Sequence, residues 1–288
     1  MKPPPFGYCR AGSVEQALAL LAEHGDDAKL LAGGQSLVPM LNLRLARPSF
    51  LVDVDRLALD QISVIDASVE FGAMVRHQTL ERSAVVAAAA PLLQRCAPLI
   101  GHAAIRNRGT LGGSIAHADP AAELPTVATA LDARFEIQSI RGVRHVAASE
   151  FFEGSFMTVL EPDEMLVGIQ VMDHGDYGCA YEEMSIRAGD FAVAGVAAAI
   201  RVNDAAVVED ARIALSGVGG TPVRASDAER ALIGSTIDED RLSAAAEAAY
   251  EAAANAPDDI HGTRGYRRAL ARLLTRRAVT NACRGLPT

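Results

Sequence analysis

The spacing of apolar residues predicts an α/β arrangement over the first part of the chain. Helical spacing runs from Ser13 to His24, and Ser13 followed by Gln16 resembles a capping box at the start of that helix. Short apolar runs at 29–32 and 50–54 each predict a buried strand. A strand, a connection and a second strand within about thirty residues predict a βαβ-like unit.

The pattern then becomes mixed, with period-two alternation beside helical runs. The expected strands are 62–65, 69–73, 135–140, 143–147 and 166–171, and the expected helices are 80–90 and 91–101. The first two strands predict a hairpin, and so do the third and fourth, which meet at the turn Arg141-Gly142. This second stretch therefore predicts an α+β lobe.

The last third changes from strands to helices. Two strands, 193–202 and 206–216, are expected on either side of an Asn203-Asp204 turn, and helical spacing follows at 225–233, 238–254 and 265–283. A sheet followed by helices is typical of an α+β domain. We expect three units: an α/β lobe at 1–58, an α+β lobe at 59–176, and a sheet-plus-three-helix domain at 177–288.

Charge and composition narrow the functional classes. The 288 residues carry 36 acidic and 27 basic side chains, a net charge of −9, so a nucleic-acid partner is not expected. The one basic cluster, from Arg264 to Arg277, follows a helical pattern and is interpreted as a solvated helix face. Aromatic residues make up only 5% and Trp is absent, which predicts an aliphatic core.

Cysteine usage and hydropathy indicate a cytoplasmic protein. Cys9, Cys96, Cys179 and Cys283 are far apart with no CxxC pair, which is typical of a reducing compartment and argues against a zinc site or an iron–sulfur cluster in this chain. No apolar run approaches the ~18 residues of a membrane span, and the N-terminus resembles no signal peptide. A peripheral position at the inner membrane face stays open.

Two glycine pairs are the strongest candidates for ligand binding. Gly33-Gly34 comes directly after an expected strand, and Gly112-Gly113 ends an irregular stretch. Glycine lets a ligand approach the main chain, where successive N–H groups can converge on an anion. Ser36, Thr110 and Ser114 add hydroxyl donors, so two such loops suit a dinucleotide diphosphate, although each loop alone is also typical of a tight turn.

Several other motifs are weaker. The stretch 217–222 matches GxGxxG only in part, since Pro222 stands where the third glycine belongs, and no GxxxxGK[ST] occurs. Ser114 with His117 or His102 is a poor candidate for a serine hydrolase, because the strand–turn–helix context is lacking. The scattered histidines form no metal motif.

Two acidic pairs are open to a structural or a binding role. Asp53 and Asp55 are interpreted as a cap or turn at a strand end rather than as metal ligands. Asp119 and Glu123 could accept hydrogen bonds from a ligand, or Asp119 could cap a helix with Pro120 in its first turn. No catalytic acid, base or nucleophile set emerges.

These motifs carry a resemblance to a known family. The stretch Leu31-Ala32-Gly33-Gly34-Gln35-Ser36-Leu37, the stretch from Thr110 to Pro125, the opening Pro-Pro-Phe-x-Tyr and the stretch 185–192 resemble the FAD-binding medium subunits of molybdenum hydroxylases. Carbon monoxide dehydrogenase medium subunits and xanthine dehydrogenase FAD-binding subunits belong to this family. The resemblance covers essentially the whole chain.

The resemblance implies a fold and a cofactor site. The fold would be a two-lobed FAD-binding domain of the vanillyl-alcohol-oxidase (PCMH) type, followed by a C-terminal domain of antiparallel sheet and helices, with FAD between the two lobes. The implied FAD-binding residues are Leu30, Leu31, Ala32, Gly33, Gly34, Gln35, Ser36, Leu37, Ile100, Thr110, Leu111, Gly112, Gly113, Ser114, Glu123 and Leu166. Gln35 replaces a histidine of many relatives, and Ile186 replaces a common arginine. Some relatives have a lysine near the positions of Glu182 and Glu183, where this chain has carboxylates, so that cofactor contact is not expected here.

The resemblance also implies partners and an electron path. A large subunit would hold the molybdenum cofactor and a small subunit two [2Fe–2S] clusters, in a dimer of heterotrimers. Electrons would pass from the clusters to FAD and on to quinone, NAD or oxygen, with no catalytic residue or metal in this chain. A stand-alone FAD-dependent oxidase and a scaffold that has lost FAD are the alternatives.

Overall fold

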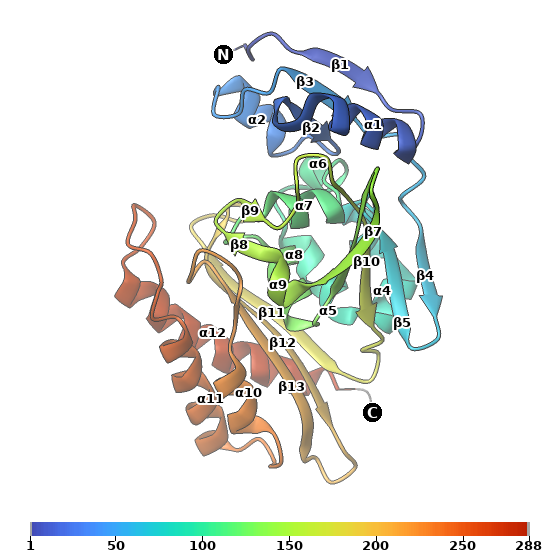
Figure 1. Cartoon of the computed structure of the whole chain (residues 1–288). Coiled ribbons are helices and arrows are strands. Elements are labelled where there is room, and N and C mark those ends of the chain that lie inside the picture. Colours follow the sequence, from blue (N-terminus) through green and yellow to red (C-terminus); the bar gives the residue numbers. More distant parts are fainter. Residues whose placement is uncertain (1, 287–288) are drawn as a thin grey trace.

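The computed structural model describes residues 2–286, which build three principal sheets one after another along the chain (Figure 1). The N-terminal sheet is parallel, in the order β1-β3-β2. Its elements are β1 (Gly7–Arg10), α1 (Val14–His24), β2 (Ala28–Leu31), α2 (Leu37–Asn42) and β3 (Phe50–Asp53). The side chain of Ser13 accepts a hydrogen bond from the N–H of Gln16 and so begins α1 as predicted. The expected βαβ-like unit is β2-α2-β3.

The second sheet is antiparallel and has five strands in the order β4-β5-β10-β6-β7. The strands are β4 (Ile62–Ile65), β5 (Ser68–Gly72), β6 (Arg134–Ser139), β7 (Gly142–Ala147) and β10 (Met165–Met172). Helices fill the connection from β5 to β6: α3 (His77–Arg82), α4 (Ala84–Ala89), α5 (Pro91–Cys96), α6 (Ala103–Arg106), α7 (Leu111–His117) and α8 (Glu123–Ala130). A small hairpin, β8 (Phe152–Gly154) with β9 (Met157–Thr158), follows α9 (Ala148–Phe151).

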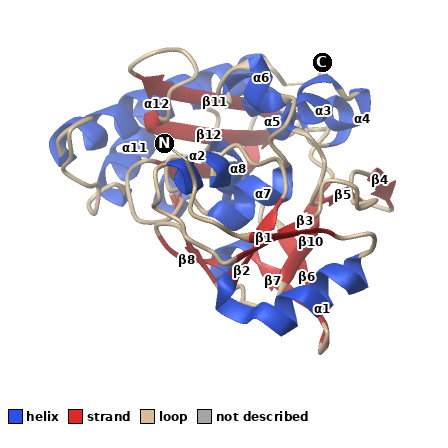
Figure 2. Ribbon diagram, turned by 90° about the horizontal axis from the view of Figure 1, so that it is seen from above, coloured by secondary structure: helices blue, strands red, loops and turns tan. Residues whose placement is uncertain are grey.

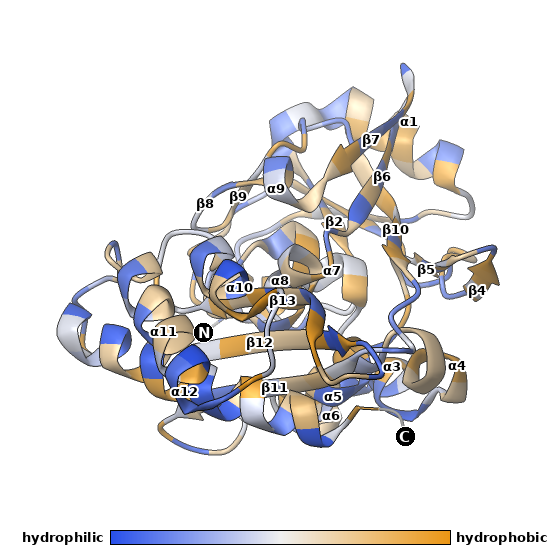
Figure 3. Ribbon diagram, turned by 90° about the horizontal axis from the view of Figure 1, so that it is seen from below, coloured by the Kyte–Doolittle hydropathy of each residue, from blue (hydrophilic) through white to orange (hydrophobic). Residues whose placement is uncertain are grey.

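The C-terminal domain is a four-stranded sheet backed by three helices. The strands follow the order β11-β12-β13-β14 and are antiparallel. They are β11 (Gly178–Ser185), β12 (Ala192–Val202), β13 (Val208–Ser216) and β14 (Val223–Arg224), and the helices are α10 (Ser226–Leu232), α11 (Glu239–Ala252) and α12 (Arg264–Arg284). Figure 3 shows mostly apolar colours along β12, which is buried on both faces.

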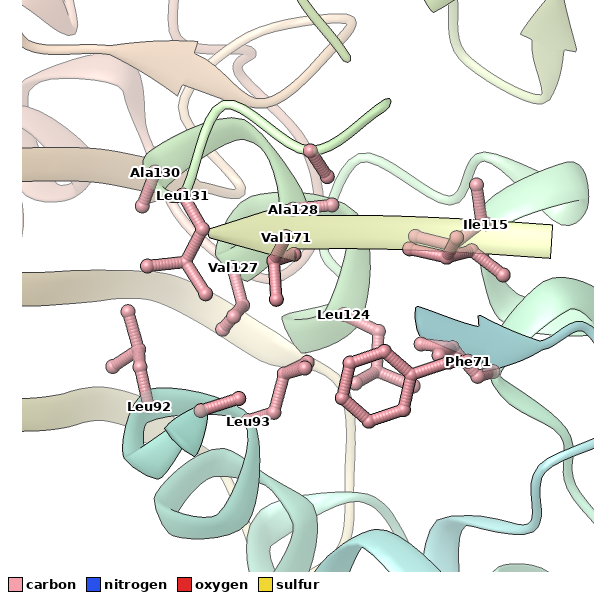
Figure 4. Packing of buried hydrophobic residues seen from close by; sticks show 14 of the residues in the cluster. Phe71, Leu92, Leu93, Ile115, Leu124, Val127, Ala128, Ala130, Leu131 and Val171 are labelled. Atoms are coloured by element: carbon pink, nitrogen blue, oxygen red, sulfur yellow. The ribbon is translucent and has the colours of Figure 1, made fainter. Parts of the chain in front are cut away.

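The core is aliphatic, as the composition predicts. The middle lobe packs α5 and α8 against each other, with Leu92 and Leu93 of α5 facing Leu124 and Val127 of α8 (Figure 4). The same cluster continues to Tyr181 on β11. One face of the C-terminal sheet therefore rests on helices of the middle lobe, and the other face rests on its own helices.

The structure corrects several sequence-based expectations. The expected helix over 80–90 is two helices, because Ser83 ends α3 and its side chain caps α4. The basic cluster on α12 is not simply a solvated face: the buried Arg267 donates to the carbonyl oxygens of Val193 and Gly217 and pairs with Asp259. Strands β1 and β11 were not predicted, because neither sequence alternates strictly between apolar and polar residues as a half-buried strand does.

Candidate functional site

The first glycine pair lies where the chain leaves β2 and turns into α2. Gly34 has a φ of +73°, a conformation that favours glycine. Among the hydrogen bonds of residues 2–286, none uses the main-chain N–H of residues 33 to 37 as a donor. Consecutive N–H groups without a protein acceptor are the donor set that binds an anion such as a phosphate.

The second glycine pair has a different structure, because it forms the first turn of α7. The N–H of Leu111 donates to the carbonyl of Val75 and that of Gly112 to the carbonyl of Ala73, each over 2.8 Å. The N–H of Gly113 donates to Oγ1 of Thr110, which is the N-cap residue, over 3.1 Å. The main-chain donors here are already used, so what this segment can offer a ligand is side-chain hydroxyls. The expectation of an irregular loop at this point was wrong.

A buried histidine holds this second segment in place. His77 is 5% exposed, and its Nε2 lies 2.9 Å from the carbonyl oxygen of Thr110. Its own main-chain N–H donates to the carbonyl of Gly109 over 3.1 Å. Burial lowers the pKa of His77 to about 4, so the ring is neutral near pH 7 and carries its proton on Nε2.

The structure brings the two glycine segments together. A Cβ atom on Gly33 would collide with the main chain at Arg108 and Gly109, and one on Gly113 would lie 3.8 Å from Cβ of Ala32. Figure 1 shows α2 above α7, and in Figure 2, viewed from above, α2 lies beside α7 and nearer to the viewer. The two segments, about eighty residues apart in the sequence, thus lie side by side at the junction of the N-terminal and middle lobes.

An arginine fastens this junction. The guanidinium of Arg76 is paired with Asp55 of the N-terminal lobe and donates to the carbonyl oxygen of Arg108. Arg108 itself lies 3.8 Å from Asp55. Asp53 accepts the N–H of Asp55 over 2.8 Å, so this acidic pair forms a turn, as interpreted from the sequence.

The glycines are needed for packing between protein segments. A Cβ on Gly112 would lie 2.5 Å from Cβ of Ala73 and 2.8 Å from its carbonyl oxygen. A side chain there, or on Gly33, would meet the protein rather than fill the space of a ligand. Residue type alone does not distinguish these two roles of glycine.

The remaining candidate residues fall into two groups. Leu30 and Leu31 lie on β2, and Ile100 and Leu166 are buried in the same core cluster as Leu111. Gln35 is exposed and donates to the carbonyl of Gly33 over 3.1 Å, while Ser36 and Leu37 begin α2. These residues border the junction from the strand and from the core beneath it.

The acidic stretch after α7 corrects a second expectation. Asp119 does not cap a helix that starts at Pro120: its Oδ1 accepts the N–H of Ala121 in a turn, and α8 begins at Glu123. Glu123 is 7% exposed, and desolvation raises its pKa to about 7. The hydrolase candidates are not assembled, since His117 packs on Phe156 and His102 lies against Gly189.

A pair of polar residues on the face of β11 that packs on the middle lobe was missed in the sequence. Tyr181 and Glu183 alternate on β11, so both side chains face the middle lobe. The hydroxyl of Tyr181 lies 3.2 Å from Oγ of Ser216 on β13. Tyr181 and Glu183, two polar residues at period two, were the available signal, but β11 itself was not expected.

Comparison with known proteins places the chain. Residues 4–171 match the family model described as the FAD binding domain in molybdopterin dehydrogenase, and residues 179–282 match the CO dehydrogenase flavoprotein C-terminal domain. Within residues 2–286 no helix combines the length and hydrophobicity that a membrane crossing requires. No group of three His, Cys, Asp or Glu side chains in the same residues could hold a metal ion.

Relatives match over their full length. The alpha subunit of the 6-hydroxypseudooxynicotine dehydrogenase complex of Paenarthrobacter nicotinovorans is 43% identical over 100% of this chain and 98% of its own. The structure superposes on carbon monoxide dehydrogenase from Hydrogenophaga pseudoflava with a TM-score of 0.96 and 40% identity, covering 100% of both chains. For quinoline 2-oxidoreductase from Pseudomonas putida 86 the TM-score is 0.93, with 38% identity and 99% of both chains covered. The chain therefore belongs to the family of FAD-binding medium subunits of molybdenum hydroxylases and is an oxidoreductase subunit of that class.

Proposed function

We propose that FAD binds at the junction of the two glycine segments, between the lobes 1–58 and 59–176, with its diphosphate on the free N–H groups of residues 33 to 37. That row of unpaired main-chain donors is the observation that carries the proposal. A diphosphate is an anion with several acceptor oxygens, so the donor set fits it. The C-terminal domain, 177–288, forms the third unit.

Residues from both lobes would complete the site. Thr110 and Ser114 offer hydroxyl groups from the start of α7, and the hydroxyl of Ser114 has no hydrogen-bond partner among residues 2–286. Glu123 supplies a carboxyl from the start of α8, while Ile100 and Leu166 provide apolar packing. When bound, FAD supplies the redox chemistry, and this chain contributes position, electrostatics and exclusion of water.

The chain would pass electrons between partners rather than oxidise a substrate. The four cysteines are dispersed, and Cys96 and Cys179 are buried, so the chain offers no thiolate set for an iron–sulfur cluster. We place the molybdenum cofactor in a large subunit and two [2Fe–2S] clusters in a small subunit, in a cytoplasmic dimer of heterotrimers. Quinone, NAD or oxygen would accept the electrons.

A pair of glycine variants tests the FAD site. Gly34 and Gly234 both have positive φ, +73° and +82°, but Gly234 lies in the C-terminal domain with no atom near its Cβ position. Replacing either with alanine costs about 1–2 kcal/mol of backbone strain. We expect Gly34→Ala to weaken FAD binding roughly tenfold or more, since relief of the strain re-orients the free N–H groups.

Isothermal titration of FAD into the purified full chain makes the measurement, with thermal denaturation recorded alongside. Gly234→Ala should lose similar stability and keep the affinity of the unsubstituted chain. Equal FAD affinity in both variants would contradict the placement of the diphosphate on residues 33 to 37.

A further inference from the structure

Two carboxyl groups, the buried Glu123 and the half-buried Glu183, lie where the middle lobe meets the C-terminal sheet. Glu123 begins α8, and Glu183 projects from β11 toward the same helices. Between them the sheet presents Tyr181, Gly195 and Ser216 in neighbouring strands. A Cβ on Gly195 would lie 2.5 Å from Oγ of Ser216 and 2.8 Å from the hydroxyl of Tyr181, so a glycine here leaves room for these polar groups.

No cation balances the two carboxyl groups. Neither Glu123 nor Glu183 takes part in an ion pair among residues 2–286, although many other carboxylates of the chain do. Oε2 of Glu183 is buried and has no hydrogen-bond partner in the described part of the chain. A buried carboxylate oxygen without a donor is costly, and it is relieved when the oxygen carries a proton.

The groups that face the pair include one further negative charge and no positive charge. They are Cys96 on α5, Tyr181 on β11 and Asp119 in the turn before α8, while β12 and β13 contribute only small or apolar side chains and Ser216. The N–H of Gly217, the residue after Ser216, donates to the carbonyl oxygen of Pro120 over 2.8 Å, which fixes the segment before Glu123 against the strands that carry Gly195 and Glu183. Burial is the main cause that raises the pKa of Cys96 and of Tyr181, and the charge of Glu123 adds to it. Burial, together with Glu123, raises the pKa of Glu183 to about 8.

We propose that Glu123 and Glu183 form one proton-holding site whose charge is coupled to the oxidation state of the bound FAD. The inference rests on the proposed function, because Glu123 is one of the residues assigned to the cofactor. Near neutral pH the pair holds one proton and one negative charge. In an ion pair, protonation of the carboxylate leaves its cationic partner unpaired. This site contains no cation, so one carboxylate can gain or lose a proton without that cost.

The proton balance of this coupling is simple. Electrons from the partner clusters add negative charge at the FAD site, and the pair then takes up one proton from solvent, forming one O–H bond on the remaining carboxylate. No covalent bond of the chain breaks. When electrons leave for the external acceptor, that O–H bond ionises and the proton returns to solvent.

The test compares Glu183→Gln with Glu182→Gln in the FAD-loaded full chain. Glu182 is the neighbouring carboxylate on the opposite side of β11, where it accepts a hydrogen bond from Asn281 over 2.8 Å. The midpoint potential of the flavin is measured by spectroelectrochemical titration at several pH values. We expect Glu183→Gln to raise the potential above about pH 8, where the pair is charged, and to leave it unchanged near pH 6, where both carboxyls are protonated.

Glu182→Gln should follow the unsubstituted chain at every pH. A shift of the potential in Glu183→Gln that is the same at all pH values, or no shift at all, overturns the proposal while FAD binding and the proposed function stand. If Glu183→Gln yields no folded protein, Glu123→Gln gives the same comparison.

Infrared pH titration of the FAD-free chain is an independent readout. We expect the carbonyl band of a protonated carboxylic acid to persist at neutral pH in the unsubstituted chain and in Glu182→Gln, and to be lost in the double variant Glu123→Gln/Glu183→Gln. Absence of that band from the unsubstituted chain overturns the proposal. A chain that shows the band but binds no FAD defeats the proposed function and leaves the shared proton supported.

Discussion

The two glycine segments look alike in sequence and differ in what they offer a ligand. Residues 33 to 37 follow a strand, and their main-chain N–H groups have no acceptor in the described chain. The segment from Thr110 to Ser114 opens a helix, and the carbonyls of Val75 and Ala73 together with the Thr110 hydroxyl occupy its first N–H groups. A Gly-Gly pair next to a hydroxyl residue therefore specifies a close approach of main chains, and the neighbouring elements decide whether a ligand or the protein makes that approach.

The largest effect should come from the glycine that packs against protein. We expect Gly112→Ala to destabilise the chain by about 3 kcal/mol, because the added Cβ would lie 2.5 Å from that of Ala73 in a buried contact that cannot relax. Urea denaturation followed by circular dichroism measures this. Gly265→Ala, at a position with no atom near its Cβ, is the control. If the Gly112→Ala chain folds with unchanged stability, Gly112 is not needed for packing against Ala73.

The second prediction concerns how the stability of the Thr110–Ser114 segment depends on pH through His77. Burial lowers the pKa of His77 to about 4, below the value near 6.5 of an unfolded histidine. The unfolded chain therefore binds a proton before the folded chain does, so the stability that depends on neutral His77 is present above about pH 6.5 and is lost as the pH falls toward 4. That loss approaches about 3 kcal/mol at the acid end.

His77→Gln keeps a donor for the carbonyl of Thr110 and removes the titration. Its free energy of unfolding should fall less steeply than that of the unsubstituted chain between about pH 6.5 and 4.5. His145→Gln, on the largely exposed strand β7, should keep the steep dependence. Parallel curves for His77→Gln and the unsubstituted chain would show that the histidine does not hold the second segment by a neutral ring.

The smallest expected effects distinguish the roles of the Thr110 and Ser114 hydroxyl groups. Thr110→Ala should lower stability by about 1 kcal/mol, because Oγ1 of Thr110 caps α7. Ser114→Ala should leave stability unchanged and weaken FAD binding by about 1 kcal/mol, roughly fivefold, through the loss of one neutral hydrogen bond. Thermal denaturation and FAD titration of both variants decide the matter. Ser114→Ala with unaltered FAD affinity would leave the first segment as the sole phosphate contact.

The local sequence pattern was sufficient to predict an element where the whole element has the same kind of surroundings. The hairpin β6-β7 alternates with period two and was predicted to within a residue or two, and Ser13 identified the start of α1. The start of α8 could not be placed in the same way, since Asp119 and Pro120 satisfy the local rules for a helix N-terminus and yet form a turn. Strand β11 is similar: its first half is buried, while in its second half Glu183 faces the middle lobe and Glu182 faces α12.

The sequence by itself determined the family, the three-part order of sheets and the two segments that meet at the lobe junction, because these depend on motifs and periodicities within a few residues. Only the tertiary structure decided which glycine segment keeps its N–H groups free, and that Glu183 faces the middle lobe, which carries Glu123. Both outcomes depend on partners distant in the chain, such as Ala73 and Val75 for α7. A main-chain donor or a buried carboxyl acquires its role from what the fold places beside it.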